Sequence, residues 1–393
     1  MVTKKISYLA ILVSPPNLKY LFFLSLILLV NCALRKIPSS SEINPYWKKV
    51  ELPFNLNSWG IMNLDFFDTV NGWAVGIEGL YSKNNRKGFI LKFDGSSWNF
   101  CDLPEISNDW ILWGIKVINP YNIWAVGADF KNNSENPDAL IIHYNGTIWE
   151  KTIPDDSKEN IKGIIKSIDF SNDSQGWAVG TQSNRGVILN YKNSEWKIYQ
   201  FEKRKYAYWG LTSVVFDKGN SWWISGWDIS SGFLGFLLKF ENNEWVEKFP
   251  EKIDFEYSIN SFYFVSPNDG WAAGRYQITG NLSKGLILRY ENNTWYKWGL
   301  AGHPFNDVEF FSVFPIQNNE LWAAGGIDLP YIAHYRNISK EYEGEFINLK
   351  IKNGIIRSIY FTSKNTGWAA GADFSSGESK STGLILKYEK LPL

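Results

Sequence analysis

A short apolar motif recurs seven times in this chain, and the interval between copies limits what the chain can fold into. The first copy reads Gly72-Trp73-Ala74-Val75-Gly76, and its Trp recurs as Trp124, Trp177, Trp223, Trp271, Trp322 and Trp368. Successive copies are 46 to 53 residues apart. Repeats of about 40–50 residues with strand-like content are typical of β-propeller blades. The repeat therefore predicts an all-β fold of seven blades.

Each repeat carries four strand signals in a fixed order. An inner strand has an apolar residue seven positions before the pentad Trp, such as Phe66; in the sixth repeat Phe314 lies eight before, which predicts one inserted residue. The pentad is the second strand, because a continuous apolar run suits a strand buried on both faces. The third strand resembles residues 88–93, and a tight turn then leads to a fourth strand that opens with an aromatic residue such as Trp98.

Two details of the third strand can be checked directly. The turn after it is expected at pairs that tolerate positive φ, such as Asp94-Gly95 in the first repeat and Lys192-Asn193 in the third. The strand also carries a polar residue at one fixed position, occupied by His143 and His334 in two repeats. A position that is polar in every repeat predicts a solvated register rather than a metal ligand or a catalytic base.

The last repeat lacks its fourth strand, because the chain ends five residues after Tyr388. A matching segment, residues 46–53, precedes the first complete repeat and resembles residues 98–104. We therefore expect it to complete the last blade and remove the free edges of an open ring. The prediction is a single seven-bladed propeller of four-stranded blades over residues 46–393, forming a monomeric ring.

The N-terminus reads as an export signal rather than as part of the fold. Lys19 precedes an apolar run of eleven residues from Tyr20 to Val30, shorter than the roughly 20 residues of a membrane span. The run ends at Asn31-Cys32, which resembles a bacterial lipoprotein cleavage box in which Cys32 becomes lipidated. Residues 1–31 are then the signal peptide and residues 32–45 a tether, and the protein faces the periplasm or the exterior of the cell envelope. An uncleaved anchor and an ordinary cleaved signal stay as alternatives.

Composition excludes several functions. Forty basic and forty acidic residues cancel, so no net field favours nucleic acid. The three histidines do not cluster, and the two cysteines, Cys32 and Cys101, are too few for a disulfide scaffold. We find no catalytic or metal-ligand spacing and expect no cofactor.

The repeat unit resembles the propellers of the photosystem II stability/assembly factor type and, more loosely, the sialidase-type Asp-box repeats. The resemblance covers about residues 46–390 and rests on the pentad, the Ile-Leu-x-Tyr strand and the turn before Trp98. The Asp-box pattern Ser-x-Asp-x-Gly-x-x-Trp is approached only by Asp94-Gly95-Ser96-Ser97-Trp98. The resemblance implies the fold, and it implies either a binding and assembly role or a glycan-active hydrolase.

A candidate binding site lies where the chain enters the inner strands near the axis. Aromatic residues stand fourteen positions before four of the pentad Trp residues, namely Trp59, Trp110, Trp209 and Tyr257, with Trp113 and Trp227 adjacent. Carboxylates follow the pentads at similar offsets: Asp129, Asp228, Asp328 and Asp373. An aromatic mouth suits sugar faces or peptide side chains. The alternatives are that the rings fill gaps between blades and that the carboxylates are solvated loop residues.

These features favour an exported, membrane-anchored and non-catalytic scaffold that binds a protein or glycan partner of the cell envelope. The alternative is a sialidase-like hydrolase, which would need three arginines, a carboxylate and a Tyr around the axial mouth. A structural subunit of an envelope complex is a third possibility, and it would expose an apolar patch.

Overall fold

The computed structural model describes residues 45–390 except 83, 132–134, 153–160, 202–207, 230–233, 252, 254–255, 280–281, 299–308, 318–319, 327–328, 337–342, 348, 350 and 378–379. The expected signal peptide, Cys32, Asp328 and nearly all of the tether lie outside these residues. Contacts divide the chain into Met1–Ile37 and Pro38–Leu393, and every described residue belongs to the second unit. Within the described part, no helix has the length and apolarity of a membrane span.

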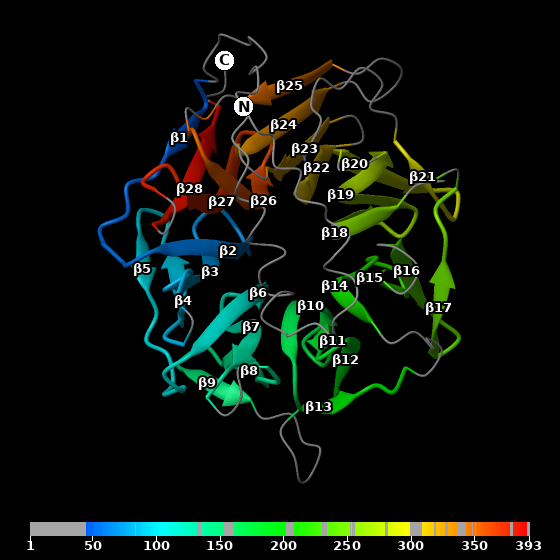
Figure 1. The fold of residues 1–393 in the computed structure, drawn as a ribbon, viewed down its shortest axis with the longest axis horizontal. Helices are drawn as coiled ribbons and strands as arrows, with labels where there is room; N and C mark the ends of the chain where they lie inside the picture. The colour runs from blue at the N-terminus through cyan, green and yellow to red at the C-terminus, as the bar shows by residue number, and fades with distance from the viewer. Residues whose placement is uncertain are drawn as a thin grey trace, which may run out of the picture. The chain divides into compact units, whose positions relative to one another are not determined.

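The described chain forms seven antiparallel sheets of four strands each, which confirms the predicted fold class. The first strand of each blade lies innermost (Figure 1). These inner strands are β2 (Trp59–Phe66), β6 (Trp110–Asn119), β10 (Ile164–Asn172), β14 (Trp209–Phe216), β18 (Tyr257–Ser266), β22 (Phe310–Gln317) and β26 (Gly354–Ser363). The second strands contain the pentads: β3 (Gly72–Glu78), β7 (Asn122–Asp129), β11 (Gln175–Gln182), β15 (Trp222–Asp228), β19 (Asp269–Thr279), β23 (Glu320–Gly325) and β27 (Thr366–Asp373).

The two outer strands of each blade follow the same order. The third strands are β4 (Lys87–Phe93), β8 (Asp138–Tyr144), β12 (Arg185–Lys192), β16 (Leu234–Glu241), β20 (Leu282–Glu291), β24 (Tyr331–Arg336) and β28 (Thr382–Glu389). The outermost strands are β5 (Trp98–Phe100), β9 (Trp149–Thr152), β13 (Glu195–Ile198), β17 (Glu244–Lys248), β21 (Thr294–Lys297), β25 (Glu343–Ile347) and, from the N-terminal side, β1 (Trp47–Lys49).

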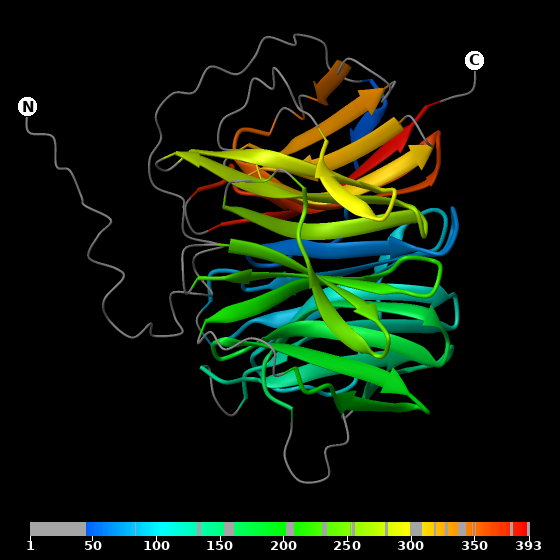
Figure 2. The same ribbon diagram turned by 90° about the vertical axis from the view of Figure 1, so that its right-hand side faces the viewer.

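The blades form a closed ring. Each inner strand contacts the inner strands of both neighbouring blades, including β2 with β26, and the side view shows strands of successive blades side by side (Figure 2). The seventh sheet has the order β1-β28-β27-β26, with Trp47 opposite Tyr388. The strand that the last repeat lacks thus comes from the segment that the sequence assigned to it.

Aromatic packing between blades explains why the same aromatic positions recur in the repeats. The pentad Trp368 stacks on Phe66 of the next blade, with ring centroids 5.5 Å apart, and meets the edge of Trp98. The same stacking recurs at other junctions, with the pairs Trp124–Phe170, Trp223–Phe264 and Trp322–Phe361. All seven pentad Trp side chains are buried. The inner-strand Phe and the outer-strand Trp of one blade therefore pack against the pentad indole of the preceding blade.

Two local predictions need correction. The sixth repeat contains no inserted residue, because Phe314 pairs with Trp322 as Tyr360 pairs with Trp368. The turn of the third blade lies one residue later than predicted, at Asn193 and Ser194, which both have positive φ (55° and 64°). Lys192 still pairs with Glu195 and so belongs to the strand.

Candidate functional site

Every inner strand carries a β-bulge at the same position, eleven residues before the pentad Trp. At this position the pairing with the second strand skips one residue, so that residue has no partner across the ladder. A bulge turns a side chain away from the regular alternation of the strand and is common next to functional sites. The seven bulged residues are Met62, Trp113, Lys166, Thr212, Asn260, Phe311 and Arg357.

The last glycine of the pentad makes room for this bulge. Gly127 pairs with Leu112, directly beside the bulged Trp113. A Cβ on Gly127 would lie 1.9 Å from the backbone oxygen of Ile111, a distance that no side chain tolerates. The corresponding glycines of four other blades show the same close approach, at 1.8–2.0 Å. The pentad glycine therefore fixes where the inner strand bulges.

Three bulged side chains from three blades contact one another across the centre of the ring, and a fourth is close enough to feel their charge. The guanidinium carbon of Arg357 on β26 lies 5.5 Å from the ring centroid of Trp113 on β6 and 5.4 Å from that of Phe311 on β22. The charge of Arg357 also acts on Lys166 of β10. Trp113, Lys166, Phe311 and Arg357, called here the axial cluster, are half-buried, so each stays in contact with solvent.

The axial cluster is positively charged and poorly neutralised. Burial, together with the smaller effect of the Arg357 charge, lowers the pKa of the Lys166 ammonium to about 8. Burial also lowers the pKa of the Arg357 guanidinium to about 10, with the carboxylate of Glu309 opposing. Glu309 is itself ion-paired with Arg275 (3.6 Å) and accepts a hydrogen bond from Asn260 (2.8 Å). Among the described residues, no carboxylate forms an ion pair with Lys166 or Arg357.

A second set of charges, three residues further along the inner strands, is neutralised internally. The ammonium of Lys116 lies 2.8 Å from a carboxylate oxygen of Asp169. Burial alone would lower the pKa of Lys116. The charges of Asp169 and Asp65 outweigh this effect and raise the pKa above its usual value. The two carboxylates also accept backbone N–H bonds from the next blade, at Phe216 and Val117. This set joins neighbouring blades at the open edge of their inner strands.

Four of the predicted binding residues lie between blades instead of around an open mouth. Trp59, Trp110, Trp209 and Tyr257 are only 2–7% exposed. Each ring packs over a third-strand glycine of the preceding blade; a Cβ on Gly383 would lie 1.9 Å from the ring of Trp59. We therefore correct the expectation that these rings form the mouth, because they fill the space that glycine leaves. Trp113 is the exception, since its bulge places it in the axial cluster.

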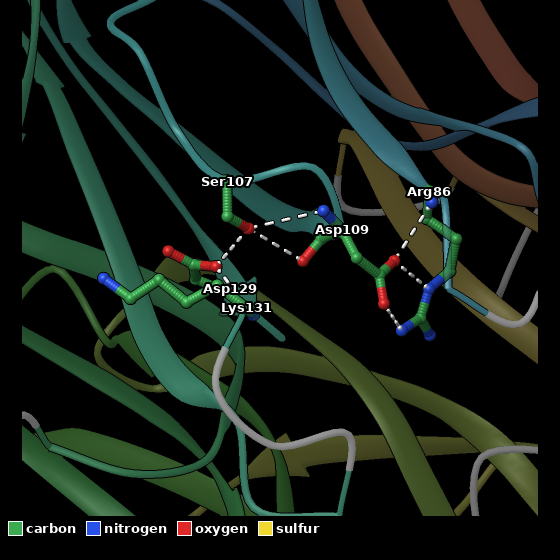
Figure 3. Close-up of polar contacts among 5 residues, drawn as sticks. All are labelled: Arg86, Ser107, Asp109, Asp129 and Lys131. Atoms are coloured by element: carbon green, nitrogen blue, oxygen red, sulfur yellow. Dashed lines mark hydrogen bonds and ion pairs between the residues drawn. The ribbon is translucent and has the colours of Figure 1, made fainter.

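The predicted carboxylates are held by the protein itself. Asp129 is 1% exposed and accepts hydrogen bonds from the Ser107 hydroxyl and the Lys131 N–H (Figure 3). Nearby, Arg86 forms a bidentate pair with Asp109, with both N···O distances 2.8 Å (Figure 3). Asp228 is 4% exposed at the end of β15. Asp373 is half-buried and accepts a bond from the Ser375 N–H. These carboxylates end strands and fix loops.

The third-strand polar position is half-buried in six blades and buried at His334, so the predicted solvated register holds only in part. His334 is 2% exposed, and its ring stacks on Trp322 with centroids 3.8 Å apart. His143 stacks on Trp124 in the same way, at 4.0 Å. In four other blades a cation lies over the pentad indole: Lys92, Lys239, Arg289 and Lys387. The polar residue is therefore a cross-strand partner of the Trp.

The sequence contained a usable signal for the axial residues. The pentad glycine marks the bulge, and the bulged residue lies eleven positions before the pentad Trp in every blade. The predicted mouth rests on the position fourteen residues before the pentad Trp, and side chains at that position point into the junction between blades. Counting from the bulge instead identifies Lys166, Phe311 and Arg357 as well as Trp113.

Seven four-stranded sheets close through β1 and β28, and the inner strands surround one axis. The chain is a seven-bladed β-propeller. Its sequence gives no match to protein-family models or to curated proteins. Similar solved propellers include YCF48 bound to D1 peptide, with 18% identity and a TM-score of 0.57 over 88% of this chain and 97% of that one.

Two further solved propellers have the same extent of similarity. YCF48 from Cyanidioschyzon merolae is 15% identical, with a TM-score of 0.56 over 88% of this chain and 98% of that one. An ulvan lyase of a polysaccharide lyase family is 10% identical, with a TM-score of 0.55 over 87% and 96%. At these identities the similarity concerns the fold, and the propeller fold carries both binding proteins and enzymes.

Proposed function

We propose that this propeller is an exported, membrane-anchored and non-catalytic scaffold that binds a partner of the cell envelope at its axis. Lipidation of Cys32 would anchor it, and residues 33–45 would hold the ring away from the membrane surface. The single observation that carries the binding role is the axial cluster, in which Lys166 and Arg357 meet without a carboxylate partner among the described residues.

Physical chemistry supports a binding role for this cluster. Partly desolvated cations without a counter-ion are costly, so they are rare unless a ligand or partner compensates them. Arg and Trp are also among the residue types enriched at the positions that contribute most binding energy in protein interfaces. One structural neighbour, YCF48, was solved with a D1 peptide. We extend from it only the idea that a propeller of this size binds a polypeptide.

The alternative of a sialidase-like hydrolase gains no observation in its favour. It requires three arginines around the axial site. Of the described arginines, Arg357 lies in the axial cluster, Arg275 pairs with Glu309, and Arg86 and Arg289 pair with Asp109 and Asp269. Three of the described arginines are thus engaged by acidic residues of the protein, and a fourth lies in the axial cluster. A non-catalytic role therefore stays our proposal.

Affinity capture from detergent-solubilised native membranes tests the scaffold function. We expect the full chain to enrich a specific envelope partner, and the double variant Lys166→Met, Arg357→Gln to lose it. A control variant, Lys192→Gln, removes one exposed cation at the end of β12 and should keep the partner. The proposal fails if the wild-type chain captures no protein that an unrelated lipoprotein, used as control bait, does not also capture. It also fails if the chain hydrolyses sialosides or cleaves uronides.

A further inference from the structure

The aromatic rings of the axial cluster hold Arg357 in place before any ligand arrives. Its guanidinium has one ring on β6 and another on β22 within 5.5 Å. Such contacts satisfy the face of the guanidinium plane and leave its N–H groups directed along the edges. Neither the guanidinium of Arg357 nor the ammonium of Lys166 donates a hydrogen bond to another described residue. A guanidinium held between rings and a nearby ammonium, both with unused donors, are therefore available at the axis.

The remaining polar bulged residues are already committed to the scaffold. The hydroxyl of Thr212 donates to the backbone oxygen of Ile259 (2.8 Å). The amide of Asn260 donates to Glu309 (2.8 Å) and to the backbone oxygen of Phe310 (2.9 Å). Sugar hydroxyls would need several polar partners to replace water. The bulged residues offer charge and apolar surface instead, which suits an acidic group next to apolar atoms.

The second set of charges, around Lys116, shows that the protein neutralises an inner-strand cation with its own carboxylates where no ligand is needed. Lys116 has Asp169 at 2.8 Å and the charge of Asp65 nearby. Lys166 is also a half-buried lysine of an inner strand, yet the charge acting on it is the like charge of Arg357. An incoming carboxylate would supply at Lys166 and Arg357 what Asp169 supplies at Lys116.

From this geometry we propose that the axial cluster is a carboxylate-binding site for an acidic peptide segment of the partner. The carboxylate would lie against the guanidinium edge of Arg357 and the ammonium of Lys166, with the apolar part of the segment on Trp113 and Phe311. This inference rests on the proposed scaffold function and names the chemistry that the scaffold recognises. The carboxylate can be a Glu side chain or a chain terminus, because both present the same two oxygens.

Titration calorimetry on the purified full chain tests the proposal with four probes. The first is a blocked Leu-Leu-Glu-Leu-Leu peptide, and the second is its Gln counterpart. The third is the Gln peptide with a free C-terminal carboxylate, and the fourth is glucuronate. We expect at least one of the first and third probes to bind, with an affinity that falls as salt rises. The neutral peptide and glucuronate should not bind measurably.

Matched variants assign the binding to the axis. Arg357→Gln should weaken the bound peptide roughly 10-fold or more, as expected for lost charge-assisted hydrogen bonds, and Arg357→Lys should recover only part. Lys192→Gln should change nothing. Near-UV circular dichroism of each variant checks that the ring stays folded. Unchanged affinity in a folded Arg357→Gln overturns the site, and so does binding of glucuronate in preference to both acidic peptides.

Partner capture separates this inference from the function on which it rests. If folded axial variants still capture the membrane partner, the scaffold function holds and the carboxylate site is wrong. If the wild-type chain captures no partner, the scaffold function itself fails. Loss of capture together with loss of acidic-peptide binding supports both.

Discussion

The guanidinium of Arg289 lies over the indole of Trp271, with Cζ 4.3 Å from the ring centroid. The two residues are opposite each other on β20 and β19. The same cross-strand relationship joins Lys92 to Trp73 and His334 to Trp322. Six of the seven blades thus cover one side of the pentad indole from their own third strand, while the next blade packs against the ring. The Trp connects two blades because the repeat supplies both of its contacts: the third-strand residue of its own blade and the aromatic residues of the next blade.

Replacing Arg289 tests this relationship. Arg289→Met removes the cation–π contact and leaves Asp269, its ion-pair partner, with a 17% exposed side chain and no cation. We expect the free energy of unfolding to fall by about 2–4 kcal/mol. Lys92→Met removes only the contact with Trp73, 5.4 Å away, and should cost about 1 kcal/mol or less. Urea unfolding curves measure both; equal losses would show that the Asp269 pair is unimportant.

The repeat in the sequence was sufficient for the fold but not for the site. The pentad spacing, the inner-strand Phe and the orphan strand at Trp47 are properties of every blade junction, so they could be read from one chain. The seven bulged residues differ in type from blade to blade, from Met62 to Arg357, so the repeat marks them by their offset from the pentad Trp and not by residue type. Their placement depends on a bulge, which shifts the side-chain alternation by one residue. An offset of fourteen residues from the pentad Trp correctly gives the start of the inner strand, but the side chains at the ring axis lie at an offset of eleven.

Adding one methyl group at the bulge should damage both fold and site. In Gly127→Ala the new Cβ meets the backbone oxygen of Ile111 at 1.9 Å, so the inner strand must shift. We expect a loss of about 3 kcal/mol or more and a displaced Trp113. The control is Gly60→Ala, whose Cβ has side-chain atoms as its nearest contacts, the flexible end of Leu80 at 2.9 Å and the Cβ of Ala372 at 3.1 Å, and which should cost less. Thermal unfolding followed by Trp fluorescence compares the two; a smaller shift for Gly127→Ala would contradict the role of the glycine.

Closure through β1 predicts a sharp difference between two truncations. Trp47 is 8% exposed and its ring lies 5.7 Å from Trp322 and 5.3 Å from Tyr388. Removing residues 46–53 should lower the melting temperature strongly, because β28 then becomes a free edge and the Trp cavity stays empty. Removing residues 33–44 should have almost no effect on melting. Equal shifts for the two truncations would refute the closing role of β1.

The proposed anchor depends on one side chain that can be changed without touching the ring. Cys32→Ser should prevent incorporation of a palmitate analogue and move the protein from the membrane to the soluble fraction, since one peptide segment of eleven apolar residues anchors poorly. Cys101→Ser is the matched control, because burial raises the pKa of that thiol to about 11 and makes it a poor nucleophile. Lipid labelling that survives in Cys32→Ser would refute the anchor.

Lys166→Met should stabilise the propeller while abolishing its proposed ligand binding. Burial and Arg357 lower the pKa of Lys166 to about 8 in the folded chain, against 10.5 for an ordinary lysine. The unfolded chain therefore binds more protons between pH 8 and 10.5, and the wild-type protein gains stability as the pH rises through this window. Replacing Lys166 removes that dependence and should raise the free energy of unfolding at pH 7 by about 1 kcal/mol or more.

The difference between the two unfolding free energies isolates Lys166 from the other groups that titrate in alkali, such as Arg357 and the buried tyrosines. We expect the difference to shrink as the pH rises from 8 to 10.5. Acidic peptide should raise the pKa of Lys166, so binding should weaken above pH 8 in the wild-type chain. If Lys166→Met instead lowers stability at pH 7, the lysine is a structural partner, and the axial charge is compensated within the protein.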